Sequence, residues 1–328
     1  MQQYYERINL NTELSNISKN ICERYNLGLY VSDKIVEIGY EDFNYILTTS
    51  DNKYFIKILY NGRDEKEAND YLNRLKKVCE SKVSFPKLLN YNGGLLYKLK
   101  INDVLYRIFV FEYIDGKNLF ELGISLTEEE IVYIAQQIKI IHSIDLKPNF
   151  IYDSWAISSF PKEYENKKDV IPNGFQDKIF SLYKDYKNIE FDKLPHAFVH
   201  GDIMNTNIMK DKKGKLWLID IAVSNYLPRI QDLVVISCNL CMTDDKEESY
   251  RRIKILVDEY CKNISFTKYE KYAFKLFFDI SNAMFLMQAS YQKSIGNNSK
   301  ETNFWFNKGK RGLEFSSEKQ FDKIFNKK

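Results

Sequence analysis

The chain has 328 residues, of which 44% are apolar and 15% aromatic, so it can bury a substantial core and is not predicted to be disordered. Its 48 basic and 45 acidic residues give a net charge of +3 and are mixed along the sequence. Because nucleic-acid-binding proteins concentrate basic residues in one stripe or tail, this pattern disfavours nucleic acid as a partner.

No segment predicts insertion into a membrane. The most apolar stretch, 273–291, is interrupted by Lys275, Asp279 and Asn282, and the N-terminus lacks the charged-then-apolar pattern of a signal peptide. The five cysteines are odd in number and widely spaced, which is typical of a reducing compartment. We therefore expect a cytoplasmic protein without a membrane partner.

The first third of the chain predicts a small β-sheet with one inserted helix. A helix is expected at 13–26, and the extended stretches 35–49 and 54–59 are expected to form a hairpin that turns at Asp51–Asn52. Residues 64–79 carry apolar side chains at helical spacing. Two further strands are expected around 95–99 and 104–113.

Helical patterns dominate after Asp115–Gly116. At 127 and 267 a threonine is followed three residues later by a glutamate, which is the capping box that opens helices expected at 127–142 and 267–294. Two short strands are expected around 198–200 and 216–220. The sequence thus predicts an α+β protein with an N-terminal lobe at 1–112, a mostly helical lobe at 113–328 and a hinge at 113–117.

The strongest chemical signal is an ordered set of polar residues between 200 and 220. His200-Gly201-Asp202 follows a short strand, Asn207 comes five residues later, and Asp220 ends the Leu218-Ile219-Asp220 strand. Phosphoryl transfer needs a carboxylate at the attacking hydroxyl and oxygen ligands that hold Mg²⁺ against nucleotide phosphates. A turn at 211–214 lets the chain double back, which brings Asn207 and Asp220 together.

The segment HGDIMNTN followed by LWLID resembles the catalytic and metal motifs of the aminoglycoside phosphotransferase/choline kinase superfamily. The resemblance implies that Asp202 is the catalytic base, that Asn207 and Asp220 bind Mg²⁺, and that ATP is the phosphoryl donor. It also implies a two-lobed protein-kinase-like fold, with a small N-terminal sheet lobe and a larger helical lobe. It spans roughly residues 30–310 and is strongest at these motifs.

A lysine in the middle of an apolar strand extends the resemblance into the N-terminal lobe. Lys57 in YFIKIL resembles the superfamily's lysine that contacts the α- and β-phosphates of the nucleotide. Glu67, on the helix that follows, is expected to pair with Lys57. Glu65 is a rival for the same role, because the link from Lys57 is short.

Two other segments are expected to touch the nucleotide. The strand EIGYEDFNYILTT would cover the phosphates with Gly39 as its only glycine, and it resembles the corresponding segment of type II homoserine kinases. The FEYIDG segment resembles the hinge, where backbone groups of Glu112 and Ile114 would bind the adenine edge. Because backbone performs that task, side-chain identity carries little information there.

The segment after Asp220 narrows the substrate class. Asp232 follows Asp220 by only 12 residues, which is too short for a phosphorylated, peptide-docking loop. A protein substrate is therefore disfavoured. Asp232 resembles the acid that ties the metal loop to the helical lobe in this superfamily, and we expect it to be structural.

Two further patterns have simpler explanations than a functional site. Cys238 and Cys241 have redox or zinc spacing, but without a second pair they are better interpreted as buried helix cysteines. The acidic residues at 244–248 are interpreted as a helix N-terminus, with binding of a cationic substrate as the alternative.

The sequence therefore predicts an ATP- and Mg²⁺-dependent kinase that phosphorylates a hydroxyl of a small molecule. An amino-alcohol or hydroxy-amino acid is favoured as the acceptor, and an aminoglycoside-type antibiotic is the alternative. A kinase-like structural protein of the spore-coat type is a further alternative. Such a protein would lack one or more of Lys57, Asp202, Asn207 and Asp220, all of which are present here.

Overall fold

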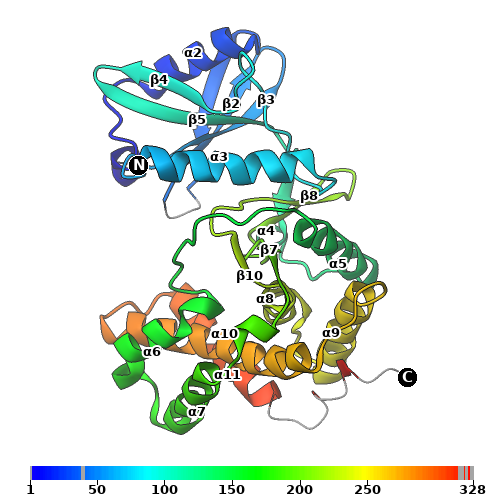
Figure 1. Ribbon diagram of the computed structural model, residues 1–328. Coiled ribbons are helices and arrows are strands. Elements are labelled where there is room, and N and C mark those ends of the chain that lie inside the picture. Colours follow the sequence, from blue (N-terminus) through cyan, green and yellow to red (C-terminus); the bar gives the residue numbers. More distant parts are fainter. Residues whose placement is uncertain (1, 38–40, 317–320, 322–323, 326–328) are drawn as a thin grey trace. The chain divides into compact units, whose positions relative to one another are not determined.

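The computed structural model describes residues 2–37, 41–316, 321 and 324–325 (Figure 1). They form two compact units. The first comprises Met1–Lys117 and Met209–Ile219, and the second comprises Asn118–Ile208 and Asp220–Lys328. The predicted lobes were continuous in sequence, whereas the structure assigns the hairpin segment 209–219 to the first unit.

Most of the first unit is an antiparallel sheet with three helices. Its elements are α1 (Gln2–Glu6), α2 (Leu14–Tyr25), β1 (Tyr30–Ile35), β2 (Phe43–Thr49), β3 (Lys53–Ile58), α3 (Glu65–Glu80), β4 (Tyr97–Ile101) and β5 (Val104–Glu112). The strand order is β1-β2-β3-β5-β4. The predicted extended stretch 35–49 is divided, because β1 ends at Ile35 and β2 begins at Phe43.

The two faces of this sheet differ in character. One face packs on α2 as a continuous apolar core, which includes Tyr45, Ile56 and Val110 of the sheet and Ile17 and Ile21 of the helix. In the first unit, Figure 1 shows α2 on one side of the sheet and α3 on the other. Side chains alternate between faces along a strand, so the residues between these core positions point toward the opposite face.

The face toward α3 is partly polar. Cross-strand pairing aligns Asn44 of β2, Lys57 of β3 and Phe109 of β5 in one row. Tyr71 of α3 packs edge-on against Phe109, with ring centroids 5.6 Å apart. The lysine is buried in this setting, at 6% exposure.

A second, three-stranded sheet contains β6 (Gly116–Asn118), β8 (Ile208–Asp211) and β9 (Leu216–Leu218), in the order β6-β8-β9. Gly116 is required by close backbone approach, since a Cβ there would lie 2.3 Å from the carbonyl oxygen of Lys210. Ser84 anchors β9 to the first unit, because its hydroxyl donates to Leu216 O and its carbonyl accepts from Leu218 N, both at 2.8 Å. These contacts explain why 209–219 belongs to the first unit.

The second unit is mostly helical. Its helices are α4 (Leu119–Leu122), α5 (Glu128–His142), α6 (Phe160–Lys167), α7 (Gln176–Lys187), α8 (Ile230–Ile236), α9 (Lys246–Tyr260), α10 (Lys268–Ser294) and α11 (Lys300–Ser316). Strands β7 (His196–Val199) and β10 (Asn225–Pro228) form an antiparallel pair. The capping boxes predicted for α5 and α10 are both present.

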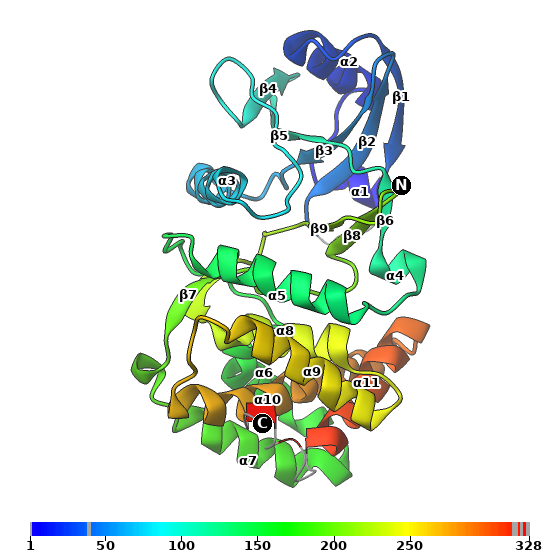
Figure 2. The ribbon, with the colours of Figure 1, turned by 90° about the vertical axis from the view of Figure 1, so that its right-hand side faces the viewer.

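Helix α10 forms the centre of this unit. It packs against α6, α7, α8 and α11, and both ribbon views show α11 alongside it (Figures 1 and 2). Phe274, Phe277 and Phe278 of α10 are fully buried, together with Phe160 and Phe198. None of the helices in the described ranges is long and apolar enough to cross a membrane.

Two predictions are confirmed: the cysteines at 238 and 241 are buried in a helical segment, and the acidic residues at 244–248 lie at a helix N-terminus. Cys238 and Cys241 are buried as free thiols within the π-helical turn η5 (Ser237–Cys241), which continues α8. The side chain of Asp245 caps α9 by accepting the backbone N–H of Glu248 at 3.1 Å. Asp244 forms an ion pair with Arg311.

We expect Gly309→Ala in α11 to destabilise the protein by about 1–3 kcal/mol. A Cβ at this position would lie 2.5 Å from the backbone oxygen of Asn282 and 2.6 Å from the backbone nitrogen of Leu286, so α11 would have to move away from α10. Helix propensity alone favours alanine by about 1 kcal/mol, so the two effects have opposite signs. Denaturant unfolding measures the difference.

The control is Gly174→Ala, because a Cβ at 174 meets nothing within 4 Å. Its unfolding free energy is expected to stay within about 0.5 kcal/mol of the wild-type value. A Gly309→Ala protein more stable than wild type would contradict the close α10–α11 packing.

Candidate active site

The loop after β7 holds Asp202 and Asn207 in direct contact. The side-chain amide nitrogen of Asn207 donates to the Oδ2 of Asp202 at 2.7 Å and to its backbone oxygen at 2.9 Å. Both N–H groups of the amide are therefore used by Asp202. This orients the remaining amide oxygen of Asn207 away from Asp202 and makes it available as an acceptor.

Asp202 lies in an unfavourable environment for a negative charge. Burial, followed by the charges of Asp153 and Asp220, raises the pKa of Asp202 to about 7, and the hydrogen bond from Asn207 opposes this shift. The structure thus brings Asp202, Asn207 and Asp220 into one site, as the sequence predicted, and adds Asp153. A cation near these carboxylates would relieve their repulsion.

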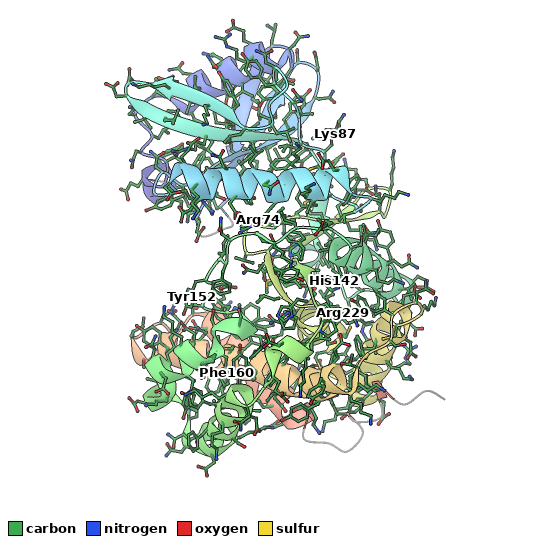
Figure 3. The ribbon with its side chains drawn as sticks, in the orientation of Figure 1. Arg74, Lys87, His142, Tyr152, Phe160 and Arg229 are labelled. Atoms are coloured by element: carbon green, nitrogen blue, oxygen red, sulfur yellow. The ribbon has the colours of Figure 1, made fainter. Side chains whose placement is uncertain are left out.

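The buried Asp232 binds the backbone of the loop that follows β7. Asp232 accepts the backbone N–H groups of His200 at 2.9 Å and Gly201 at 2.8 Å, and the Nε2 of His142 lies 3.0 Å from its Oδ2. His142, labelled in Figure 3, also contacts the hydroxyl of Tyr260 through Nδ1 at 2.8 Å. Asp232 therefore has the structural environment that the sequence analysis expected.

The electrostatics of Asp232 are opposite to those of Asp202. Burial alone would raise the pKa of Asp232, but the hydrogen bonds and charges around it, from His142 first, lower it below its ordinary value. Asp232 is therefore ionised. Because an ionised carboxylate only accepts hydrogen bonds, Nε2 of His142 carries the proton that it donates to Asp232.

Left-handed backbone occurs at two points of the site. Gly201 has φ +86° and Asp220 has φ +60°. The aspartate conformation is supported locally, since its Oδ1 accepts the backbone N–H of Ala222 at 3.1 Å. Uncommon backbone conformations of non-glycine residues are concentrated at functional sites. They cost conformational free energy, which the surrounding contacts must offset, but they direct a side chain to a required position.

Asp153 reaches the site on a loop that β10 holds in place. The side-chain amide of Asn225 accepts from the backbone N–H of Ile151 at 2.8 Å and donates to its carbonyl at 2.9 Å. The Oδ1 of Asp153 then accepts the N–H of Trp155 at 2.9 Å. Asp153 was not predicted from the sequence, because it lies 49 residues before Asp202 with no motif of its own.

The residues present fit a magnesium ion that is completed by nucleotide phosphates. Magnesium in such sites is bound through one or two protein oxygens, with phosphate and water completing the shell. Asn207 offers its amide oxygen and Asp220 a carboxylate. Across the described ranges there is no group of three or more His, Cys, Asp or Glu side chains that could hold a metal alone. A phosphate-dependent site is consistent with that finding.

Lys57, in the first unit, has a carboxylate partner that the sequence analysis did not name. Its Nζ lies 3.5 Å from the Oδ2 of Asp42, whose Oδ1 lies 3.3 Å from the Nε of Arg63. The ring of Tyr71 is 5.6 Å from Nζ. The amide oxygen of Asn44, across the strand pair from Lys57, is buried without a hydrogen-bond partner among the described residues.

Glu67 and Glu65, the two predicted partners of Lys57, have other roles in the structure. The exposed side chain of Glu67 accepts the backbone N–H of Asp64 at 2.9 Å, which completes the capping box of α3. Glu65 forms ion pairs with Lys98 and Arg107. Both glutamates lie in the first turn of α3, where helix capping and surface pairing engage their carboxylates.

The remaining predicted nucleotide contacts stay predictions. Gly39 lies outside the described residues. The backbone N–H of Glu112 donates to Lys87 O at 2.9 Å, and the carbonyl of Ile114 accepts from Gly116 N at 2.9 Å. The side chain of Glu112 is exposed and pairs with Lys87 at 3.2 Å.

The chain belongs to the phosphotransferase enzyme family, whose model matches residues 34–262. The superfamily resemblance is therefore confirmed, whereas the finer likeness to type II homoserine kinases stays a prediction. No curated protein matches the sequence.

Solved structures with a similar fold include small-molecule kinases. A choline kinase from Streptococcus pneumoniae has 17% identity and a TM-score of 0.60, over 92% of this chain and 99% of that one. A spectinomycin phosphotransferase crystallised with ADP and spectinomycin has 15% identity and a TM-score of 0.64, over 95% and 100%. An amicoumacin kinase bound to AMP-PNP and Ca²⁺ has 13% identity and a TM-score of 0.67, over 93% and 94%. The predicted kinase-like α+β fold is confirmed.

We expect Asp202→Asn to stabilise the nucleotide-free protein, increasingly so from about pH 4 to pH 7. The folded-state pKa of about 7 lies above the unfolded value of about 3.9, so the wild-type protein loses stability as pH rises through this window. Asparagine removes this ionisation and still accepts from Asn207. Thermal unfolding at pH 4, 6 and 8 measures the effect.

Asp232→Asn is the matched control, with the opposite sign. In the wild-type protein the folded-state pKa of Asp232 is lowered. The ionised carboxylate of Asp232 therefore stabilises the fold at neutral pH, and this stabilisation is lost in acid. Loss of this carboxylate should destabilise the protein by about 3 kcal/mol at pH 7. Equal effects of the two substitutions at every pH would contradict the assigned electrostatics.

Proposed function

We propose that the protein transfers the γ-phosphoryl group of ATP to a hydroxyl group of a small molecule, with Mg²⁺ as the metal. The observation that carries the proposal is the contact of Asp202 with Asn207 on the loop that follows β7, close to Asp220 after β9 and to Asp153 on the loop 151–155. Membership of the phosphotransferase family supports it. The kinases of similar fold that were crystallised with ADP or AMP-PNP support the choice of nucleotide.

Asp202 is proposed as the base that accepts or aligns the acceptor's hydroxyl proton. A base works best when its pKa lies near the working pH, and without metal the pKa of Asp202 is raised to about 7. The side-chain nitrogen of Asn207 donates to the carboxylate of Asp202 and to its backbone oxygen, which fixes the position of the carboxylate. Asp232 keeps the loop rigid through the backbone of His200 and Gly201.

Asn207 and Asp220 are proposed to hold the metal. When bound, Mg²⁺ would neutralise charge on the nucleotide phosphates. Asp220 is aimed by its left-handed backbone, and Asn207 presents an amide oxygen because its nitrogen is engaged by Asp202. The same two ligands relate metal binding to the ionisation of Asp202, because neutralising Asp220 would lower the pKa of Asp202.

Lys57 is proposed to contact the nucleotide phosphates from the first unit. Burial limits the freedom of its side chain, and the Oδ2 of Asp42 lies 3.5 Å from its Nζ. Gly39 and backbone groups of Glu112 and Ile114 are proposed as further nucleotide contacts, as the resemblance implies. For the acceptor, an amino-alcohol or hydroxy-amino acid is favoured over an aminoglycoside-type antibiotic.

We expect Asp202→Asn to lower turnover by roughly 10²- to 10⁴-fold while Mg·ATP still binds. The loss follows because asparagine cannot accept the hydroxyl proton. The measurement is ADP formation in the presence of a panel of small hydroxyl compounds, with nucleotide affinity followed by calorimetry. Wild-type turnover in this variant would remove Asp202 from the proposed role.

Asp220→Asn is expected to raise the Mg²⁺ concentration needed for half-maximal activity by at least about 10-fold, because a metal-ligating carboxylate becomes a neutral amide. A magnesium titration at fixed nucleotide measures the change. The control is Asp244→Asn, an exposed acid of the same unit that pairs with Arg311. An equal magnesium requirement in the two variants would contradict the metal assignment.

A further inference from the structure

An aromatic cluster next to the Asp153 loop surrounds the side chain of Lys308. The cluster consists of Trp155, Phe285, Phe304 and Trp305, whose neighbouring ring centroids lie 5.0–6.4 Å apart. The Nζ of Lys308 lies 5.0 Å from the ring centroid of Phe285, 4.9 Å from that of Trp305 and 5.7 Å from that of Phe304. A cation at these distances is attracted by the ring faces.

The polar partner of Lys308 is a neutral amide. Its Nζ donates to the Oδ1 of Asn239, which lies in the π-helical turn η5. The amide is fixed in this orientation because its nitrogen donates to Val235 O at 2.9 Å. No carboxylate lies within 4.0 Å of this ammonium in the part of the chain that the structure describes. Burial lowers the pKa of Lys308 to about 8, as expected for an incompletely compensated charge.

The cluster adjoins the proposed active site through the loop 151–155. The backbone of Trp155 is bonded to Asp153, and its ring lies 5.7 Å from that of Trp305. Asp153 in turn acts on the ionisation of Asp202. Trp155 is 38% exposed and Phe304 51% exposed, so a small molecule can reach the edge of the cluster.

We propose that Lys308 recognises a carboxylate of the acceptor, so that the substrate is a hydroxy acid. The proposal rests on the proposed function, because the acceptor's hydroxyl must reach Asp202. It selects the hydroxy-amino acid from the two acceptor types that remained open above and disfavours a plain amino-alcohol. A carboxylate would give the Lys308 ammonium the charged partner that it lacks among the described residues.

The same geometry disfavours binding of a cationic group of the acceptor at the aromatic cluster. The ring faces that would attract a substrate ammonium already hold the ammonium of Lys308, so a second cation would meet a like charge. Another lysine, Lys162 of α6, has its Nζ 4.2 Å from the ring centroid of Tyr152, which belongs to the loop 151–155. The nearby carboxylate of Glu163 is engaged by Tyr152 and by Lys167. It is therefore not available to a cationic substrate.

The test compares hydroxy acids with their own carboxamides as acceptors, for example L-homoserine with L-homoserine amide. With Mg·ATP, kcat/KM of the wild-type protein should be at least about 10-fold higher for the acid. Lys308→Met should lower kcat/KM for the acid by about 10- to 100-fold, mainly through KM, and leave the amide unchanged. Methionine fills the same space among the rings without a charge. Lys308→Arg should restore much of the preference.

Lys310→Met is the matched control, because Lys310 is an exposed lysine on the same helix. It should behave as the wild-type protein with both acceptors. Choline, ethanolamine and spectinomycin serve as cationic acceptors. Efficient transfer to one of them, with no loss in Lys308→Met and no preference for any acid, would overturn the proposal and leave phosphoryl transfer intact.

A second measurement does not depend on turnover. The rate at which acetic anhydride modifies Lys308 is followed by mass spectrometry, with each hydroxy acid or its amide present. Protection by an acid and not by its amide supports the carboxylate site, even if no acceptor is phosphorylated and the proposed function fails. The proposal would be overturned if no acid protected Lys308 and if, in addition, acid and amide were phosphorylated equally well or not at all.

Discussion

The repulsion among three carboxylates is the constraint on which the rest of the site depends. Asp153 comes from a loop far from Asp202 and Asp220 in sequence, and burial together with the charges of Asp153 and Asp220 raises the pKa of Asp202 to about 7. Such an arrangement opposes folding unless other groups fix it. Asn207 provides hydrogen bonds at the front of the loop, and the ionised Asp232 binds its backbone from behind. A metal ion would complete the charge balance.

Much of the fold follows from local sequence signals. The capping boxes of α5 and α10 lie where the threonine–glutamate spacing predicts them, and apolar periodicity locates α2 and α3. The ordered set Asp202, Asn207 and Asp220 was recognisable because its members lie close in sequence on either side of one hairpin. These features depend on neighbouring residues, which a sequence displays directly.

Features created by distant contacts were not predictable in the same way. Asp153 and Lys308 carry no motif, and only the packing of α10, α11 and the loop 151–155 gives them a common environment. Asp42 is different, since strand alternation places it on the same face as Asn44 and Lys57 and could have revealed it. Glu67 has a spacing that suits both an ion pair and a helix cap, and in the structure it caps α3, so its proposed role toward Lys57 stays a prediction.

The discontinuous first unit has a practical consequence for dissecting this protein. A fragment ending at Lys117 would lack the strand that occupies the hydroxyl and carbonyl of Ser84, and would expose the backbone of Gly116 that packs on Lys210. Excising 209–219 from the remainder would in turn sever the polypeptide between Asn207 and Asp220. Neither half can therefore be isolated by simple truncation, and a faithful minimal fragment would require a circular permutation or a grafted hairpin.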